Sequence, residues 1–253
     1  MVNAGGVAAV MRSQQQWCVH PQGMSVASEP LIGWKQHRKR AIKPWHPSKK
    51  RPLVGLQILD LTRVLAGPVA TRTLAGFGAS VLRVDPYGWE EANIVPDITL
   101  GKSCTRLDLR DQADRNIFKK LLNQAHVLVH GFRPDALAEL GFELETRLGI
   151  APNIIEVKLN AYGWTGPWRS RRGFDSLVQM SCGIADAGMK WAKQNQPTPL
   201  PVQALDHATG YLMAAAVVLA PIQIEGTPMK WQTPACELGS SEAAYNSNMD
   251  SLD

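Results

Sequence analysis

Cysteine is scarce in this sequence of 253 residues. The four cysteines, Cys18, Cys104, Cys182 and Cys236, are widely spaced. This spacing indicates neither a zinc-binding Cys/His cluster nor the dense disulfide framework of a small secreted protein. We therefore expect a reducing compartment and no bound metal.

Long apolar runs are missing as well, and we expect no signal peptide from the pattern of the first residues. The longest apolar run, Leu212–Ala220, is far shorter than the ~20 residues that span a bilayer. The first residues are small and mixed, without the basic start and apolar core of a signal peptide. These absences predict a soluble, cytoplasmic protein without a membrane partner.

The common catalytic signatures are also absent. The sequence has no Walker motif, no H-E-x-x-H and no G-x-S-x-G. Gly76 and Gly78 form a lone G-x-G that follows an expected helix and precedes an expected strand. This order is the reverse of the one that dinucleotide-binding proteins require.

Positive charge is concentrated in one segment. The net charge is +5, but eight of the 27 basic residues lie between Lys35 and Arg51, with no acid among them. Without those eight, 19 basic residues face 22 acidic ones, a net charge of −3. A solvated linker explains such a run, and a phosphate-binding arm is the alternative. The rest of the chain gives no reason to expect a nucleic-acid partner.

A hydrophobic content of 45% predicts a folded core, and its pattern is regular from Pro52 onward. The expected strands are Val54–Leu61, Ser80–Val84, Cys104–Leu109, Val127–Val129 and Asn153–Leu159. The expected helices are Ser13–Val19, Ala66–Gly78, a helix from an Asp111 cap to about Gln124, and Pro134–Leu140. Asp85–Leu100 is expected to be a loop, and Gly33–Arg51 a linker. This alternation predicts an α/β fold with a parallel sheet flanked by helices.

Ligands of such folds bind beyond the carboxyl ends of the strands. The corresponding loops are Thr62–Ala66, Asp85–Trp89, His130–Arg133 and Asn160–Arg172. Asp206 is a further candidate, because it lies where a polar loop becomes the apolar run Tyr211–Ala220. A carboxylate at a helix start is either a cap or a functional group, and the pattern alone leaves both open.

Six segments together resemble one known family, the class III CoA-transferases, also called the CaiB/BaiF family. In chain order they are Leu59–Pro68, Gly78–Pro86, Gly101–Arg110, His126–Leu137, Tyr162–Pro167 and Arg171–Asp175. The resemblance implies a Rossmann-like large domain plus a small domain, in a homodimer of two interlocked subunits. Family members move CoA between carboxylates or racemise 2-methylacyl-CoA.

The resemblance also implies a site. Asp206 aligns with the carboxylate that attacks the acyl-CoA thioester, and the implied substrates are coenzyme A, as acyl-CoA, and a carboxylic acid. The implied CoA-binding residues are Leu65, Ala66, Leu107, Arg110, Gly131, Phe132, Arg133 and Arg172. Core packing is the alternative role for Leu65 and Phe132, and surface charge is the alternative for Arg110 and Arg172.

Several positions depart from the family pattern. Phe174 stands where the racemases carry an acid/base His, which argues against racemisation because that reaction needs two bases. Pro86 and Glu139 stand where some transferases carry CoA-binding Arg residues. A CoA-transferase is therefore the first hypothesis, and a racemase-like enzyme or a non-catalytic CoA-binding remnant are the alternatives.

The ends of the chain depart further. Gly6–Gly23 resembles a segment near the family's carboxyl end, which predicts the second copy of a tandem member, shortened at its own carboxyl end. The expected domains are an N-terminal tail-like segment with the basic linker (1–51), the large domain (52–222) and an irregular C-terminal tail (223–253). The small domain is expected to be largely absent.

Overall fold

The computed structural model describes residues 6–37, 45, 48–133 and 136–225. They fold as two compact units. The small unit contains residues 6–33 and 161–203, and the sheet unit contains the described residues of 34–160 and 204–225. Most of the predicted C-terminal tail, Cys236 and much of the basic run lie outside the described residues. The domain boundaries expected at residues 51 and 222 stay a prediction.

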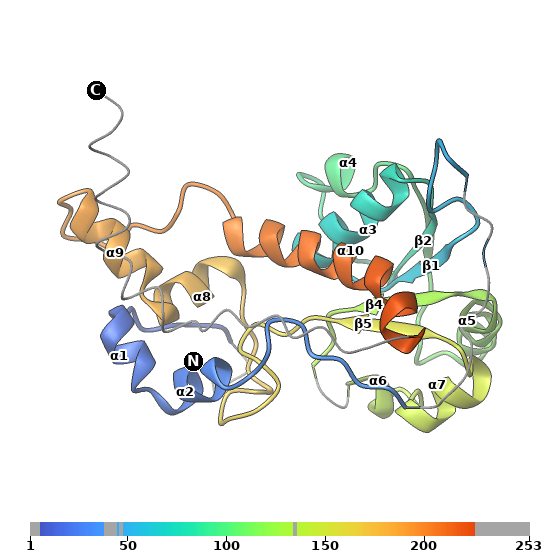
Figure 1. Cartoon of the computed structure of the whole chain (residues 1–253), viewed down its shortest axis with the longest axis horizontal. Helices are drawn as coiled ribbons and strands as arrows, with labels where there is room; N and C mark the ends of the chain where they lie inside the picture. Colours follow the sequence, from blue (N-terminus) through green and yellow to red (C-terminus); the bar gives the residue numbers. More distant parts are fainter. Residues whose placement is uncertain (1–5, 38–44, 46–47, 134–135, 226–253) are drawn as a thin grey trace. The chain divides into compact units, whose positions relative to one another are not determined.

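The sheet unit contains five parallel strands (Figure 1). These are β1 (Gln57–Asp60), β2 (Ser80–Asp85), β3 (Lys102–Arg106), β4 (Val127–His130) and β5 (Ile155–Lys158). Their order in the sheet is β3-β2-β1-β4-β5, and every neighbouring pair is parallel. The helices of this unit are α3 (Ala66–Gly76), α4 (Val95–Ile98), α5 (Gln112–Gln124), α6 (Ala136–Glu139), α7 (Leu144–Ile150) and α10 (Ala204–Glu225). The predicted α/β fold with a parallel sheet is therefore confirmed.

The central strands are buried on both faces, and alternate side chains point to different helices. Ile58 and Val129 belong to a core cluster with residues of α3 and α10. Leu59 and Leu128 belong to a second cluster, with residues of α5 and α7 beside or within it. Strands covered on both faces read as continuous apolar runs, which is the pattern of β1 and β4.

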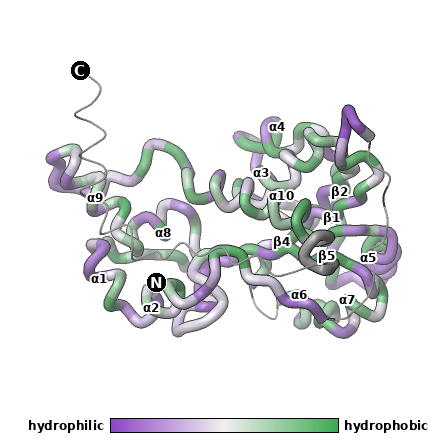
Figure 2. Tube along the Cα trace, in the orientation of Figure 1, coloured by the Kyte–Doolittle hydropathy of each residue, from purple (hydrophilic) through white to green (hydrophobic). Residues whose placement is uncertain are grey.

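Helix α5 begins where the sequence predicts. The Asp111 side chain caps it by accepting hydrogen bonds from the N–H groups of Ala113 (2.9 Å) and Asp114 (3.0 Å). Such a cap typically contributes about 1 kcal/mol. Only Phe118 and Leu122 of this helix are buried, and its hydrophilic residues are seen in purple in Figure 2.

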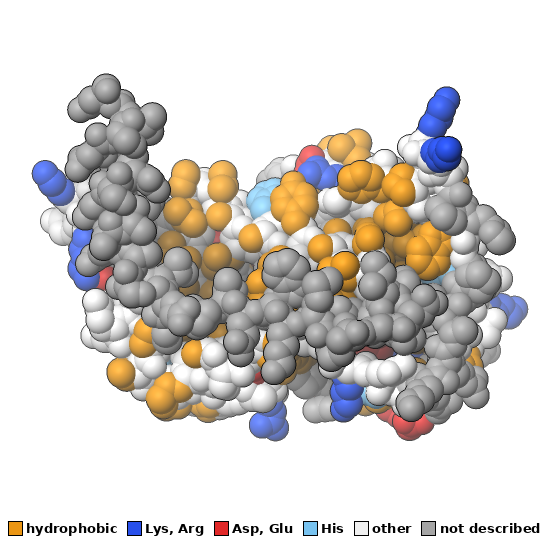
Figure 3. Space-filling view, in the orientation of Figure 1, with side chains coloured by type: hydrophobic (Ala, Val, Ile, Leu, Met, Phe, Trp, Pro, Cys, Tyr) orange, Lys and Arg blue, Asp and Glu red, His pale blue; other side chains and the backbone are white. Residues whose placement is uncertain are grey.

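Helix α10 differs from α5 because apolar side chains occupy its outer face as well as its inner one. Met213 and Val217 are buried, whereas Tyr211 and Val218 are exposed. Figure 3 shows hydrophobic side chains, in orange, over the region of α3 and α10. The run Tyr211–Ala220 therefore lacks the polar stripe that marks the exposed face of an amphipathic helix.

Several element boundaries differ from the prediction. β1 begins at Gln57 rather than Val54, because Gly55 has φ +88° and the chain turns before entering the sheet. β3 ends at Arg106, so Leu107 follows the strand instead of continuing it. The expected loop Asp85–Leu100 contains α4, and α7 was not predicted.

The small unit is built from the N-terminal segment and residues 161–203. Its helices are α1 (Gln14–Cys18), α2 (Pro21–Ala27), α8 (Asp175–Cys182) and α9 (Ile184–Trp191). The first of these confirms the predicted helix at Ser13–Val19, with Ser13 as its N-cap. Buried Gln22 donates from Nε2 to the carbonyls of Tyr162 (2.6 Å) and Thr165 (2.9 Å) and accepts from the Trp168 N–H (2.5 Å). Gln22 of the N-terminal segment thus satisfies backbone hydrogen-bonding groups of a loop that is distant in the sequence.

His20 lies beside this contact, and we expect it to make the stability of the small unit depend on pH. The Nδ1 of His20 accepts from the Gln22 N–H at 3.1 Å, and burial, followed by the charges of Arg12 and Arg171, lowers the pKa of His20 from its ordinary 6.5. The unfolded chain therefore takes up the proton first, and stability present above pH 6.5 is lost as the pH falls below it. We expect limited proteolysis of the N-terminal segment to accelerate from pH 8 to pH 5. In His20→Asn, which keeps a neutral cap, this acceleration should be smaller, and an equal acceleration would contradict the assignment.

Candidate functional site

Strand β1 lies at the centre of the sheet, where it pairs with β2 on one side and with β4 on the other. The chain first adds strands on the β2 side and then on the β4 side, so the direction of strand order reverses between β1 and β4. At such a switch point the loops beyond the carboxyl ends diverge and leave room for a ligand. The loop Thr62–Leu65 follows β1, and Gly131–Arg133 follows β4. Five of the eight predicted CoA-binding residues therefore lie just beyond the carboxyl ends of these neighbouring strands: Leu65, Ala66, Gly131, Phe132 and Arg133.

A buried polar network fixes the loop that follows β1. The Asp60 carboxylate, with no solvent exposure, accepts from the Thr62 N–H (2.9 Å) and from the hydroxyls of Thr62 (2.5 Å) and Thr71 (2.6 Å). The ammonium of Lys102, also fully buried, lies 3.0 Å from Asp60 and donates to the Pro68 carbonyl at 3.0 Å. Burial lowers the pKa of Lys102 although the Asp60 carboxylate opposes that shift. The network joins β1, β3 and the first turn of α3.

The same loop contains a strained residue. Val64 has φ +65°, in the left-handed region that a β-branched residue rarely adopts. Such a conformation costs about 1–3 kcal/mol and persists only where surrounding contacts impose it. One such contact is the hydrogen bond from the Val64 N–H to Oε1 of Glu91, at 2.7 Å.

Asp206 lies in the first turn of α10, which begins at Ala204. Four residues later, Gly210 packs so closely on α3 that an added Cβ would lie 2.6 Å from the Ala66 carbonyl oxygen and 2.7 Å from Cγ1 of Val69. Residues four apart share one helix face, so Asp206 lies on the α3 side, about one turn (roughly 6 Å along the helix axis) before this contact. The half-buried Asp206 is thereby placed toward the start of α3, where Leu65 and Ala66 lie.

This position also corrects one interpretation of the sequence. Asp206 is the third residue of α10 rather than the residue that precedes it, so it is not the N-cap. A carboxylate in the first turn is still stabilised by the helix dipole. The start of α3 adds a second set of backbone N–H groups that a helix leaves without internal partners.

Gly210 is expected to tolerate no side chain. In Gly210→Ala, the new Cβ would push α10 away from Ala66, and overpacking of this kind costs about 1–3 kcal/mol. Gly149 in α7 is the matched control, because nothing lies within 4 Å of a Cβ placed there. Gly149→Ala should leave stability unchanged or raise it by up to about 1 kcal/mol. Urea denaturation of both variants checks this, and equal stabilities would contradict the close packing of α10 on α3.

The loop after β4 begins beside a second buried ionic cluster. Glu156 on β5 contacts His130 at the end of β4 (3.2 Å) and accepts from Nε and Nη2 of Arg147 (both 2.9 Å). Burial alone would raise the pKa of Glu156, but the hydrogen bonds and charges of His130 and Arg147 outweigh burial and lower it to about 2. Glu156 is therefore ionised at neutral pH and holds the residue that precedes Gly131.

The remaining predicted residues are spread more widely. Leu107 is buried in the cluster on the α5 side, and Phe132 packs partly against that cluster, as the core-packing alternative expects for Phe132. Arg110 and Arg133 are exposed, as the surface-charge alternative expects for Arg110. Arg172 is exposed in the small unit, whereas the other seven lie in the sheet unit.

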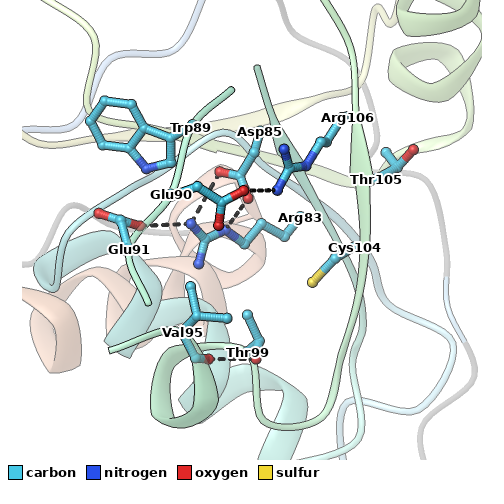
Figure 4. A pocket seen from close by; sticks show the side chains of 10 residues that line it. All are labelled: Arg83, Asp85, Trp89, Glu90, Glu91, Val95, Thr99, Cys104, Thr105 and Arg106. Carbon is cyan, nitrogen blue, oxygen red and sulfur yellow. Dashed lines mark hydrogen bonds and ion pairs between the residues drawn. The ribbon is translucent and has the colours of Figure 1, made fainter. Parts of the chain in front are cut away.

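A cavity of about 180 Å³ lies beside the carboxyl ends of β2 and β3 (Figure 4). No predicted CoA-binding residue lines it. Its lining residues are Arg83, Asp85, Trp89, Glu90, Glu91, Val95, Thr99, Cys104, Thr105 and Arg106. Sequence patterns missed the polar residues that organise this region, namely Glu91 beside the cavity and the Asp60–Lys102 pair nearby. The sequence offered one signal for Asp60, which is that an acidic residue ends an otherwise apolar strand.

Two further observations concern metals and membranes. Within the part of the chain that the structure describes, no three His, Cys, Asp or Glu side chains are grouped so that they could hold a metal ion. Among the helices described, none is sufficiently long and apolar to cross a bilayer.

The fold is that of an α/β protein with a Rossmann-like parallel sheet, and the half-buried Asp206 lies one helical turn before the contact of Gly210 with the start of α3. A family model described as CoA-transferase family III matches residues 53–228. The chain belongs to this family, which confirms the predicted resemblance.

Curated relatives extend the comparison. The chain is 34% identical over 203 residues to the acetyl-coenzyme A transferase nodX of Hypoxylon pulicicidum, covering 78% of this chain and 33% of that protein. It is 31% identical over 212 residues to the human succinyl-CoA:glutarate CoA-transferase, covering 79% of this chain and 48% of that protein. The chain therefore spans one third to one half of the length of these relatives.

A solved structure shares the fold. The crystal structure of the hypothetical protein Rv3272 from Mycobacterium tuberculosis matches with a TM-score of 0.63 and 30% identity, covering 82% of this chain and 60% of that chain. A CaiB/BaiF family protein from Brucella suis matches with a TM-score of 0.58 at 21% identity, a likeness of fold alone.

Proposed function

We propose that this chain carries the nucleophile of a CoA-transferase that moves CoA between an acyl-CoA and a carboxylic acid. The observation that carries the proposal is the position of Asp206, one helical turn before the tight contact of Gly210 with the start of α3. Family membership supplies the substrate class, since the relatives bear the names of CoA-transferases.

The proposed reaction uses Asp206 as a covalent relay. Its carboxylate oxygen attacks the thioester carbonyl of the acyl-CoA, the C–S bond breaks, and an acyl-aspartyl anhydride and CoA thiolate result. The thiolate then attacks the aspartyl carbonyl and releases the first acid, which leaves an aspartyl-CoA thioester. An acceptor carboxylate repeats the two steps in reverse and regenerates Asp206. Dividing acyl transfer in this way makes each step easier than direct exchange between two carboxylates.

Each step passes through a tetrahedral oxyanion that needs hydrogen-bond donors. The start of α3, at Leu65 and Ala66, provides backbone N–H groups on the side that Asp206 faces. Gly131, Phe132 and Arg133, beyond the neighbouring strand, are proposed to contact CoA. Arg133 is exposed and its planar guanidinium suits a phosphate group. Leu107, Arg110 and Arg172 complete the proposed CoA contacts.

The acid partner and the assembly belong to the proposal as well. We infer a carboxylic acid as acceptor and a homodimer as the active assembly, as expected from the family resemblance. Phe174, at the N-cap of α8, is 48% exposed and carries no group that could move a proton. This supports transfer over racemisation.

The test is mass spectrometry of the intact chain after incubation with a panel of acyl-CoAs. The wild type should gain a CoA- or acyl-sized mass that hydroxylamine removes, with the modification on the peptide that contains Asp206. Asp206→Ala should gain none. Binding of CoA to both proteins without any adduct would overturn the proposed enzyme and favour a CoA-binding remnant.

A further inference from the structure

The strained loop after β1 is attached to a segment outside the predicted CoA-binding set. That segment follows β2 and contains Trp89 and Glu91. Glu91 accepts the Val64 N–H through Oε1, and the guanidinium of Arg63 lies 4.6 Å from the ring centroid of Trp89. Two consecutive loop residues are thus held from the same side.

Glu91 is itself firmly anchored. Its second carboxylate oxygen, Oε2, lies 2.8 Å from Nη2 of Arg83, and the side chains of Glu91 and Arg83 are only 9% and 1% exposed. Arg83 belongs to β2, and it also pairs with Asp85 at 2.8 Å (Figure 4). Strand β2 therefore positions Arg83, and Arg83 positions Glu91 through an ion pair. Glu91 in turn binds the amide of Val64 through a hydrogen bond.

The held conformation of Val64 determines where α3 begins. Val64 is the last residue before Leu65, the N-cap of α3. A left-handed residue at that point makes the chain turn tightly, and α3 starts so close to Thr62 that a Cβ on Gly67 would lie 2.3 Å from the Thr62 Cβ. Release of Val64 would let this corner relax toward an unstrained backbone and would therefore shift the start of α3.

We propose that Glu91 is a positioning residue, which holds Val64 in its strained conformation so that the start of α3 faces Asp206. This inference rests on the proposed CoA-transfer function and adds to it a residue that contacts neither substrate nor nucleophile. Asp60 and Lys102 fix the beginning of the same loop, whereas Glu91 fixes its end.

The test compares the rate of adduct formation and the affinity for the same acyl-CoA in single-turnover experiments. Glu91→Ala should slow adduct formation by about tenfold to a hundredfold, because small displacements in an active site have effects of that size. The apparent Kd should change by less than about threefold. Glu91→Gln keeps an acceptor for Val64 and should lie between Glu91→Ala and the wild type.

Two variants separate positioning from a general structural role. Gly adopts φ +65° without steric cost, so Val64→Gly combined with Glu91→Ala should recover most of the lost rate. Glu90→Ala is the neighbouring control, because Glu90 pairs only with the surface residue Arg106 among the contacts described, and it should match the wild type. No recovery in the double variant, or an equal loss in Glu90→Ala, would overturn the inference.

Amide hydrogen exchange provides a readout that is independent of catalysis. The Val64 amide should be protected in the wild type and in Glu90→Ala, and should exchange at least about tenfold faster in Glu91→Ala. Equal exchange in all three proteins overturns the inference even if adducts form. A wild type that forms no adduct overturns the proposed function, and the Val64 exchange rates then decide whether Glu91 holds the loop.

Discussion

Asp206→Asn is expected to lower the rate of adduct formation from acyl-CoA by a factor on the order of a thousand or more, the usual result of removing a covalent nucleophile. The amide keeps the size of the carboxylate but is a far poorer nucleophile, so the fold should be retained. Single-turnover kinetics followed by mass spectrometry measure this loss.

A matched control exists in the other unit. Asp186 is the third residue of α9, as Asp206 is of α10; it is half-buried, as Asp206 is, and pairs with the exposed Lys190 at 2.7 Å. Asp186→Asn removes a first-turn carboxylate of the same kind and changes no residue of the sheet unit, so it should leave the adduct rate unchanged. Equal losses in the two variants would show that helix stability, rather than chemistry, explains the effect.

Lys102→Met is expected to destabilise the protein by about 3–5 kcal/mol, because it leaves the buried Asp60 carboxylate without its cation. The hydroxyls of Thr62 and Thr71 would still donate to Asp60, so the loss should lie toward the lower end of that range. Urea denaturation followed by circular dichroism gives the change in the free energy of unfolding.

The control for this prediction is Lys190→Met, since that lysine is 64% exposed and pairs with Asp186 one turn away on the same helix. Such pairs contribute little, so its stability should stay within about 0.5 kcal/mol of the wild type. The double variant Asp60→Asn with Lys102→Met should lose less than the sum of the single variants, because the two groups interact directly. Additive losses, or a Lys102→Met effect as small as that of the control, would contradict the buried network.

The parallel sheet could be predicted because its central strands are short apolar runs. β1 and β4 are buried on both faces, so their composition alone marks them. β3 was harder, since it lies at the sheet edge and most of its side chains are exposed or half-buried. An edge strand of this kind carries no hydrophobic pattern, which explains the displaced boundaries at Cys104–Leu109.

The cap predicted at Asp111 and the one rejected at Asp206 illustrate a second limit. Both residues precede helical patterns, but α5 begins one residue after Asp111, whereas α10 begins two residues before Asp206. The polar residues before the apolar run of α10 continue as helix, and local sequence does not show where that helix starts. The packing of Gly210 on α3, a contact between distant segments, gives Asp206 its position.

The positioning residues could not be predicted because their roles depend on distant partners. Glu91 lies in a segment expected to be loop, and only the fold brings it to Val64, 27 residues away. Gln22 likewise contacts a loop that lies 140 to 143 residues later in the chain. The hydrophobic pattern of a sequence indicates single helices and strands. These contacts join residues of different elements, and no local pattern indicates them.

The covalent role of Asp206 is tested most directly by following oxygen atoms rather than CoA. In the proposed reaction, the acceptor acid contributes the bridging oxygen of the second anhydride, and that oxygen stays on Asp206 when the thiolate takes the acyl group. The chain should be incubated with an acyl-CoA and its own acid, labelled with the heavy isotope of oxygen, across a panel of acids. The label should appear in the peptide that contains Asp206 and should be absent from that peptide in Asp206→Asn. CoA exchange between acyl-CoA and labelled acid without any label in that peptide would contradict a covalent role for Asp206.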